Sequence, residues 1–278
     1  MKNMQKMMKL LKTSPLSARI GLIVIVFGLS VALFAPVLAP FGESEVVADV
    51  WLSPSTDHLL GTDQLGRDML SRLIYGARNS ITIAFITTLI AFSVGAFLGL
   101  TAAVTGGWLD NLLSRIVDIF MAFPTLILAL MILSVLGTSI PVLIVVVALL
   151  DSTRVFRLAR ALAMDIAIME YVDAARLRGE NTFYIVRREI LPNALPALIA
   201  EFGLRFCFIF LFISSLSFLG LGIQPPTADW GSMVRENSGA INFGILTPLY
   251  PAGTIAALTV SINMVVDWFL HRSAQIRA

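Results

Sequence analysis

Lysine is almost absent from this chain. All four lysines lie within the first dozen residues: Lys2, Lys6, Lys9 and Lys12. No lysine therefore remains for a phosphate-binding loop or a Schiff base, and a nucleotide that drives the protein must be bound by another chain. The single cysteine, Cys207, cannot form a disulfide within the chain. The two histidines, His58 and His271, lie far apart in the sequence and predict no metal cluster.

Charged residues of either sign are also scarce. They make up 14% of the 278 residues, against about a quarter in a soluble domain. Hydrophobic residues make up 57%, and the mean hydropathy is +0.86. A lipid bilayer is the solvent that suits this composition, so we predict an all-α protein that crosses a membrane several times.

Six apolar runs are long enough to be transmembrane helices. The first covers residues 20–40 and follows a basic segment, residues 1–19, that has no acidic residue. The other five cover residues 79–104, 112–136, 140–163, 194–222 and 247–270. The basic segment predicts a cytoplasmic N-terminus. Six spans then return the tail, residues 271–278, to the cytoplasm, and residues 79–270 form a five-helix core.

The loop of residues 41–78 is predicted to lie on the opposite, periplasmic side. Between residues 41 and 77 it has six acidic residues against two arginines. Thr62 or Asp63 can cap a helix. Two acid-before-base pairs four residues apart would stabilise that helix: Asp63 with Arg67, and Asp68 with Arg72. We predict an amphipathic helix lying on the membrane surface, with direct contact to a substrate as the alternative.

Residues 165–193 contain the most polar segment within the apolar part of the chain. One face of a first short helix holds, at helical spacing, Tyr171, Ala174, Ala175 and Arg178. Gly179 can take the positive φ that ends this helix, and Asn181 and Thr182 can cap a second one. Pro192 then turns the chain back towards the membrane. A pair of small alanines on an exposed helix lets another protein approach closely, so we predict a docking element.

Three motifs resemble those of the permease subunits of binding-protein-dependent ABC importers, in the dipeptide, oligopeptide and nickel group. Asp173-Ala174-Ala175, Gly179 and Ile190-Leu191-Pro192 are similar to the EAA loop of that family, with aspartate in place of the usual glutamate. Gly61-Thr62-Asp63 followed by Leu65-Gly66-Arg67-Asp68 resembles the sequence before its second span. The run SLSFLGLG at residues 215–222 resembles the end of its fifth span. The similarity extends over about residues 55–267.

This resemblance implies the six-helix fold of a type I importer, with the chain as the C-type permease of a pair. It implies that the polar loop is a coupling helix held by an ATPase, through Glu170, Tyr171, Asp173, Ala174, Ala175, Arg178, Gly179, Ile190, Leu191 and Pro192. Candidates for the pathway or its gate are Asp118, Phe123, Pro124 and Ser217. Candidates for the periplasmic interface are Asp63, Arg67, Asp68 and Trp230.

The chemistry of some of these residues gives further predictions about their structure. Pro124 should kink the third span. Asp118 lies one to two turns earlier, and we expect it to pair with Arg115 or Arg154 near the cytoplasmic end, with a substrate contact as the alternative. Trp230 suits the membrane interface.

Two further patterns concern helix packing. Glu201 and Arg205 are one turn apart in the fifth span and should neutralise each other. Four glycines in and after the second span should allow close helix packing: Gly95, Gly99, Gly106 and Gly107.

Residues and resemblance together predict half of the translocation pathway of an ATP-driven importer. The chain itself would be no enzyme and would bind no cofactor, because ATP and Mg are used by its partners. Those partners would be a second, homologous permease, two ABC ATPase subunits and a periplasmic or lipid-anchored solute-binding protein, with no nucleic acid. The complex would lie in the bacterial cytoplasmic (inner) membrane.

Peptides are the substrate that this branch of the family implies. Nickel or other metal chelates, glutathione and other small solutes remain alternatives within the same architecture. An intramembrane hydrolase and an autonomous channel or carrier are alternatives of a different class, but the chain has no recognisable catalytic dyad and no visible internal repeat.

Overall fold

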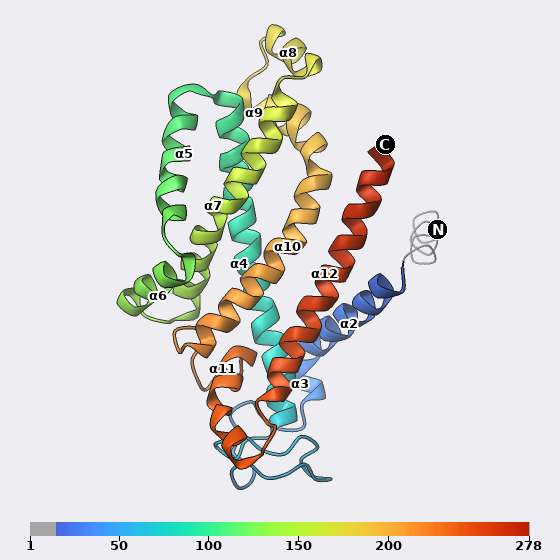
Figure 1. The fold of residues 1–278 in the computed structure, drawn as a ribbon, viewed down its shortest axis with the longest axis vertical. Helices are drawn as coiled ribbons and strands as arrows, with labels where there is room; N and C mark the ends of the chain where they lie inside the picture. The colour runs from blue at the N-terminus through green and yellow to red at the C-terminus, as the bar shows by residue number, and fades with distance from the viewer. Residues whose placement is uncertain (1–14, 278) are drawn as a thin grey trace. The chain divides into compact units, whose positions relative to one another are not determined.

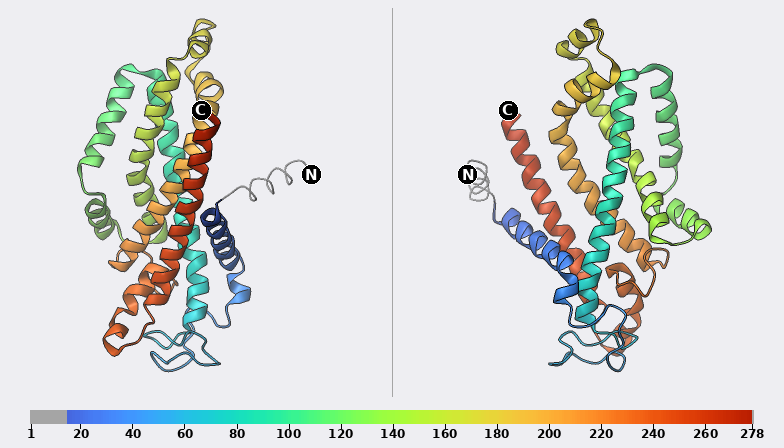
Figure 2. Two further views of the ribbon diagram at one scale, coloured as in Figure 1. Left: turned by 45° about the vertical axis from the view of Figure 1, so that its right-hand side comes forward. Right: turned by 180° about the vertical axis from the view of Figure 1, so that it is seen from behind.

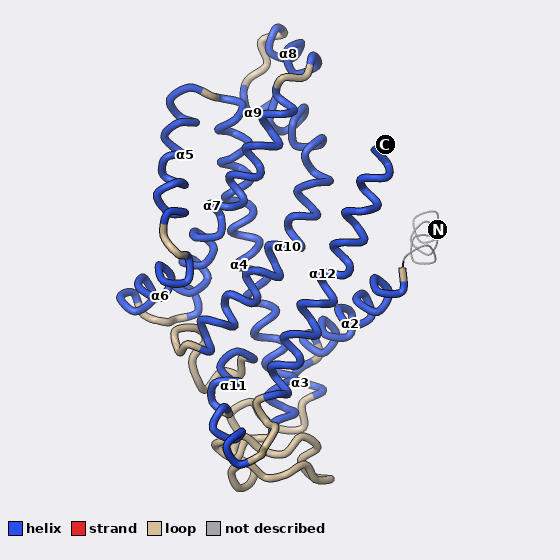
Figure 3. Tube along the Cα trace, in the orientation of Figure 1, coloured by secondary structure: helices blue, strands red, loops and turns tan. Residues whose placement is uncertain are grey.

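A computed structural model describes residues 15–277 of the chain, with side chains up to Leu270. Most of this length is helical (Figure 3), and the described residues contain isolated bridges but no β-strand. The predicted all-α fold is therefore confirmed. The contacts within the chain divide it into two units. Unit 1 holds the described residues up to Ile83 and from Phe210 onwards, and unit 2 is Ala84–Ile209.

Unit 1 combines the two ends of the chain. Its elements are α2 (Leu16–Leu33), α3 (Ala35–Leu38), the start of α4 (Met69–Thr105), the end of α10 (Leu191–Phe218), α11 (Trp230–Glu236), the 3-10 helix η2 (Ser238–Phe243) and α12 (Leu249–Arg277). Helix α2 lies alongside α12 (Figures 1 and 2), and a Cβ at Gly21 would come within 2.5 Å of the Ser261 carbonyl oxygen. This close approach is open only to glycine.

Unit 2 is the middle of the chain. Besides the end of α4 and the start of α10, its elements are α5 (Gly107–Ala122), α6 (Thr125–Leu136), α7 (Ile140–Ala167), α8 (Glu170–Leu177), α9 (Thr182–Tyr184) and the π-helix η1 (Ile185–Ile190). Gly95 and Gly99 pack against α7 as predicted, since a Cβ at either would come within 2.5 Å of an α7 carbonyl oxygen. Gly106 and Gly107 do not pack closely: both have φ of +62° and open space around them, and they form the turn between α4 and α5.

Five of the six predicted spans are recognisable by length and composition. Four are single helices, α2, α4, α12 and the continuous helical stretch Thr182–Phe218, and one is the bent pair of α5 and α6. The two members of that pair meet at 89° around Pro124, so the predicted kink is a break. The sixth prediction, residues 140–163, falls on α7. This helix is long enough, but Asp151, Arg154 and Arg157 interrupt its apolar sequence.

The helices extend beyond several of the predicted span boundaries. No interfacial helix forms within residues 41–68, because the chain there folds into turns and α4 begins only at Met69. At the other end, α12 continues to Arg277, so residues 271–277 of the predicted cytoplasmic tail are helical. Residues 1–14 of the predicted basic segment lie outside the described residues.

Pro192 does not turn the chain, contrary to prediction. Helix runs without a break from Thr182 to Phe218, through both Pro192 and Pro196. The wider π-turns of η1 immediately precede Pro192. The side chain of Asn193 donates to the Glu189 carbonyl at 2.7 Å. Proline removes one backbone donor, but the helix continues past it.

Candidate functional site

Helix α8 is a short helix after the end of α7 (Figure 1), with no side-chain cap at its N-terminus. Acidic residues in its first turn favour its N-terminal dipole. It ends as predicted at Gly179, whose φ is +81° and whose N–H donates to the Arg176 carbonyl at 2.9 Å. The next N–H donates back to Ala175, which completes a Schellman-type stop. The side chain of Asn181 then accepts from the Tyr184 N–H at 2.8 Å, so the predicted second cap is confirmed.

The two faces of α8 differ sharply. Val172 and Ala175 are fully buried in an apolar cluster. Its other buried members come from α4, α7, η1 and α10: Leu100, Ala159, Ala163, Ala167, Ile185, Val186, Ile190, Ala194 and Leu198. The opposite face leaves Leu177 90% exposed, the most exposed of the large apolar side chains described. A buried apolar inner face, and an outer face on which charged residues surround the exposed Leu177, suit a helix that contacts another protein.

This division corrects the predicted docking face. Ala174 is exposed, but its neighbour Ala175 faces the core, so the two alanines do not act together. Sequence reasoning missed Leu177, although a leucine at the end of a short polar helix was a visible signal.

The other predicted coupling residues divide in the same way. Exposed members are Glu170, Tyr171, Asp173, Arg178, Gly179 and Pro192. Ile190 is fully buried in the cluster, and Leu191 packs against it half-buried. Phe183, on the following helix α9, adds a second exposed apolar side chain at 63%.

Ion pairs join α5 to α7 in unit 2. Asp118 accepts from Arg157 at 2.6 Å, not from the predicted partners Arg115 or Arg154. Both side chains of this pair are more than half exposed. Asp110 and Arg160 form a second, bidentate pair. Arginine at positions 157 and 160 lies on the α7 face turned towards α5, which the sequence alone did not reveal.

Among the predicted pathway residues, Phe123 and Pro124 form the break after α5. Phe123 has the extended backbone expected before a proline and is 55% exposed. Ser217 is not with them. It belongs to unit 1, is 1% exposed, and its hydroxyl accepts from the Ile223 N–H at 3.1 Å, so it stabilises the turn after α10.

A partly buried charged cluster lies between α7 and α10. Glu201 and Arg205 pair at 2.8 Å, as predicted. Arg205 also reaches Asp151 of α7 at 3.4 Å. The guanidinium of Arg154 lies 4.3 Å from the ring centre of Phe208. From the sequence, Asp151 was considered only as an acid for the alternative of an intramembrane hydrolase, although an aspartate within an apolar run is itself a signal.

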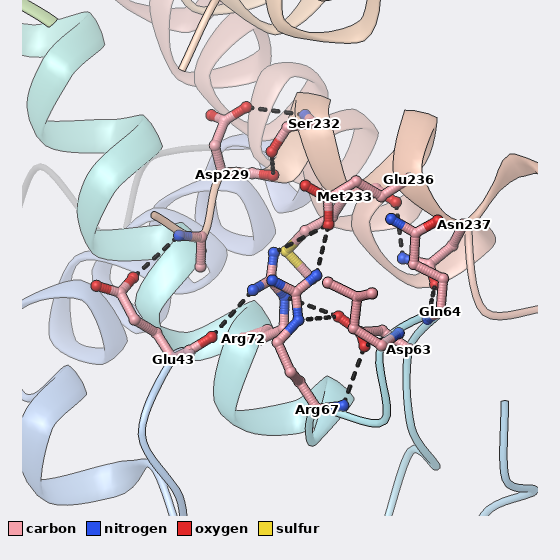
Figure 4. Close-up of polar contacts among 12 residues, drawn as sticks. Glu43, Asp63, Gln64, Arg67, Arg72, Asp229, Ser232, Met233, Glu236 and Asn237 are labelled. Carbon is pink, nitrogen blue, oxygen red and sulfur yellow. Dashed lines mark hydrogen bonds and ion pairs between the residues drawn. The ribbon is translucent and has the colours of Figure 1, made fainter. Parts of the chain in front are cut away.

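A second buried charged cluster stabilises unit 1 (Figure 4). Asp63 contacts both Arg67, at 2.6 Å, and Arg72, at 3.2 Å. Glu236 of α11 contacts the same two arginines, at 2.7 and 3.2 Å. Both arginines are at most 3% exposed. The predicted Asp63–Arg67 pair is confirmed, and Glu236, far away in sequence, is the member that sequence reasoning missed.

The predicted Asp68–Arg72 pair is wrong. The Asp68 carboxylate instead accepts from the Ser71 N–H at 2.8 Å, which is the capping contact at the start of α4. It also contacts the ring nitrogen Nδ1 of His58 at 3.2 Å. Asp68 therefore fixes where α4 begins.

Trp230 is a core residue of unit 1 rather than a membrane-interface anchor. It is 5% exposed, and its indole N–H donates to the Leu73 carbonyl at 2.9 Å. The preceding residue, Asp229, caps α11 by accepting from the Ser232 N–H, and it also accepts from the Ser80 hydroxyl. Burial raises the pKa of the Asp229 carboxyl.

Comparison with known proteins gives matches over most of the chain. The family described as binding-protein-dependent transport system inner membrane component matches residues 91–275. The dipeptide transport system permease protein DppC of Alkalihalophilus pseudofirmus is 36% identical over 251 residues, covering 90% of this chain and 83% of that protein. The di/tripeptide transport system permease protein DppC of Pseudomonas aeruginosa is 36% identical over 254 residues, covering 89% and 84%.

Two further similarities differ in kind. The glutathione transport system permease protein GsiD of Pectobacterium atrosepticum is 31% identical over 249 residues, covering 89% of this chain and 82% of that protein. A chain from the inward-facing MetNI methionine ABC transporter superposes with a TM-score of 0.53 at 18% identity, covering 72% of this chain and 97% of that one. At this identity the second likeness concerns the fold alone.

Proposed function

Because this chain belongs to the family of binding-protein-dependent transport system inner membrane components, we propose that it is the C-type permease of an importer for dipeptides and longer peptides. As a member of that family it is a non-catalytic membrane subunit, and its fold is that of a type I ABC importer. The relatives named for dipeptide and di/tripeptide transport support peptides as the substrate. The relative named for glutathione transport makes a glutathione-like solute the second candidate.

The observation that carries this proposal is the two-faced α8. Its buried face, Val172 and Ala175, belongs to the same apolar cluster as Ala163 of α7 and Leu198 of α10. A push on the exposed face, where Leu177 lies, is therefore passed directly to two long helices, because close-packed interiors transmit displacement. This is the arrangement that an ATP-driven partner needs in order to move the bundle.

Exposed charges between α5 and α7 support a pathway on that side of unit 2. Asp118 and Arg157 are more than half exposed in the isolated chain, within or beside apolar helices. Ionisable groups at such positions face water or another protein rather than lipid. We place the translocation pathway, shared with the second permease, along α7, the helix that carries Arg157.

The remaining parts of the complex follow from the family. It works with a solute-binding protein, a partner permease and ATPase subunits. In our proposal two ATPases bind ATP and Mg and contact the exposed face of α8. The N- and C-termini then lie in the cytoplasm, and the buried cluster of Asp63, Arg67 and Glu236 lies at the periplasmic side, near the binding protein.

The test is the replacement Leu177→Asp in the complete complex. Burying a carboxylate at a partner interface should weaken ATPase binding by more than about tenfold. The ATPases should no longer co-purify, and ATP-dependent dipeptide uptake in proteoliposomes should fall, while membrane insertion is unchanged. Leu65→Asp is the matched control, since Leu65 is a 52% exposed leucine of unit 1, and it should retain the ATPases. Retention of the ATPases and of uptake by the Leu177 variant would overturn the docking role of α8.

A further inference from the structure

The cluster between α7 and α10 holds a carboxylate oxygen that the described residues leave unused. Asp151 is 3% exposed, and its Oδ1 lies 3.4 Å from Arg205. Its Oδ2 is buried and has no hydrogen-bond partner within the described part of the chain. Buried carboxylate oxygens are costly without a donor. Asp151 therefore has the capacity for one more positively charged or hydrogen-bonding group.

This oxygen lies at mid-helix depth. Asp151 is about 17 Å along α7 from its first residue, at the rise of an α-helix. A bilayer core is about 30 Å thick. A residue about 17 Å from the start of a spanning helix therefore lies near the middle of the membrane. Glu201 and Arg205 are likewise interior to the long apolar stretch Thr182–Phe218. An ionisable group at such a depth marks a functional site by default.

Arg205 is shared unequally between two carboxylates. Its Nε lies 2.8 Å from Glu201, one turn away on the same helix, and its Nη1 lies 3.4 Å from Asp151 on α7. A movement of α7 relative to α10 would lengthen the second contact and leave the first intact. Arg205 would then remain with Glu201, and Asp151 would lose its ion-pair partner and keep only the weaker attraction of Arg154 on its own helix.

Both helices are joined to α8 by the cluster that buries Val172 and Ala175. Leu198, a member of that cluster, is about one helical turn from Glu201. A displacement of α8 thus reaches α10 next to the charged cluster.

We propose that Asp151 binds the primary ammonium group of the transported solute in the state in which Arg205 is paired with Glu201 alone. The solute's ammonium replaces the guanidinium as the partner of the carboxylate, with Oδ2 as the additional acceptor. No bond is made or broken, and no proton needs to move, because a carboxylate and an ammonium group pair directly. This inference rests on the proposed import of peptides, whose free amino terminus supplies the ammonium.

The test uses the complete permease–ATPase complex without its binding protein, so that only the permeases can bind solute. Radiolabelled Ala-Ala is bound to the wild-type complex and displaced with unlabelled Ala-Ala or with N-acetyl-Ala-Ala, which lacks the ammonium group. We expect displacement by the free dipeptide and not by the acetylated one. Asp151→Asn should lower the affinity for Ala-Ala about tenfold to a hundredfold, the size of a charged hydrogen bond, and Asp151→Glu should restore part of it.

Two further variants separate binding from a structural role. Asp165→Asn is the matched control, an exposed aspartate on the same helix, and should bind Ala-Ala like the wild type. Arg205→Gln breaks the same ion pair as Asp151→Asn but keeps the proposed ammonium acceptor, so it should retain affinity. The double variant should be as defective as Asp151→Asn. Recovery of affinity in the double variant would instead mean that Asp151 only balances the charge of Arg205.

The remaining outcomes also decide the question. Equal displacement by the acetylated dipeptide, unchanged affinity in Asp151→Asn, or no displaceable binding to the wild-type complex would each overturn the inference. Uptake of Ala-Ala by the full system separates this from the proposed function. If the wild-type system imports Ala-Ala and the Asp151 inference fails, peptide import stands; if it imports none, the proposed function fails first.

Discussion

The guanidinium of Arg67 lies 2.7 Å from the carboxylate of Glu236, across 169 residues of chain. Arg72 contacts the same carboxylate oxygen at 3.2 Å. Through these contacts the loop before α4 and the helix α11 become one buried structure (Figure 4). Glu236 is the only contribution of α11 to these two arginines among the described contacts, so the charge balance of the cluster depends on it.

We therefore expect Glu236→Gln to destabilise unit 1 by about 3–5 kcal/mol, the cost of leaving a buried charge without its partner. Of the two carboxylates that form ion pairs with the buried arginines, only Asp63 would remain. The measurement is the melting temperature of the purified complex in detergent. Asp57→Asn is the control, because Asp57 is an exposed acid of the same loop. Equal melting temperatures for the two variants would contradict this assignment.

The buried carboxyl of Asp229 predicts a pH dependence. Burial raises its pKa, and the hydrogen bonds from the Ser232 N–H and the Ser80 hydroxyl oppose this only in part. In the unfolded chain an aspartate has a pKa of about 3.9. Between that value and the higher folded pKa, the unfolded state has released a proton that the folded state keeps. The free energy of unfolding therefore falls as pH rises through this window.

The variant Asp229→Asn lacks this proton and should lack this part of the pH dependence. The melting temperature of the wild type minus that of the variant should decrease as pH rises from about 4. A difference that stays constant or increases over this range would show that the carboxyl is not held protonated by its burial.

The sequence predicted those features that depend on nearby residues. Gly179 and Asn181 specify the end of α8 and the start of α9 through backbone conformation and a local cap. Pro124 specifies the break between α5 and α6. Apolar length located the spans because a bilayer requires about 20 apolar residues.

Features that depend on tertiary contact were not predictable in this way. The i,i+4 spacing suggested Arg72 for Asp68, but Glu236 and Asp63 hold that arginine in the folded unit. Asp68 was then free to cap α4. Likewise, helical spacing placed Ala174 and Ala175 on one face, while the apolar cluster buries only the second. Sequence spacing predicts which residues are neighbours on a helix, but not which face of the helix packs against the core.

The close approach of α4 to α7 predicts a strict glycine requirement. A Cβ at Gly99 would lie 2.5 Å from the Phe156 carbonyl oxygen and 3.0 Å from the Ala159 Cβ. Gly99→Ala should therefore cost about 1–3 kcal/mol through overpacking. Gly253→Ala is the matched control, since nothing lies within 4 Å of a Cβ there, and helix propensity alone would favour alanine by up to about 1 kcal/mol. Opposite shifts in melting temperature are expected, and equal shifts would count against the packing argument.

Gly179 tests whether backbone conformation at the end of α8 controls coupling. Its φ is +81°, and a Cβ there would meet no atom within 4 Å, so the backbone rather than steric contact within the chain decides which residues fit. Asparagine enters the left-handed region readily, whereas a β-branched residue does so only with strain. Gly179→Asn should keep dipeptide uptake near that of the wild type. Gly179→Val should lose about 1–2 kcal/mol locally, unwind the end of α8 that carries Leu177, and reduce uptake per ATP hydrolysed while membrane insertion is unchanged. Both variants add a side chain at the same exposed position. An equal loss of uptake in both would therefore indicate that Gly179 lies in close contact with a partner. Normal uptake in both would show that Gly179 is not part of the coupling element.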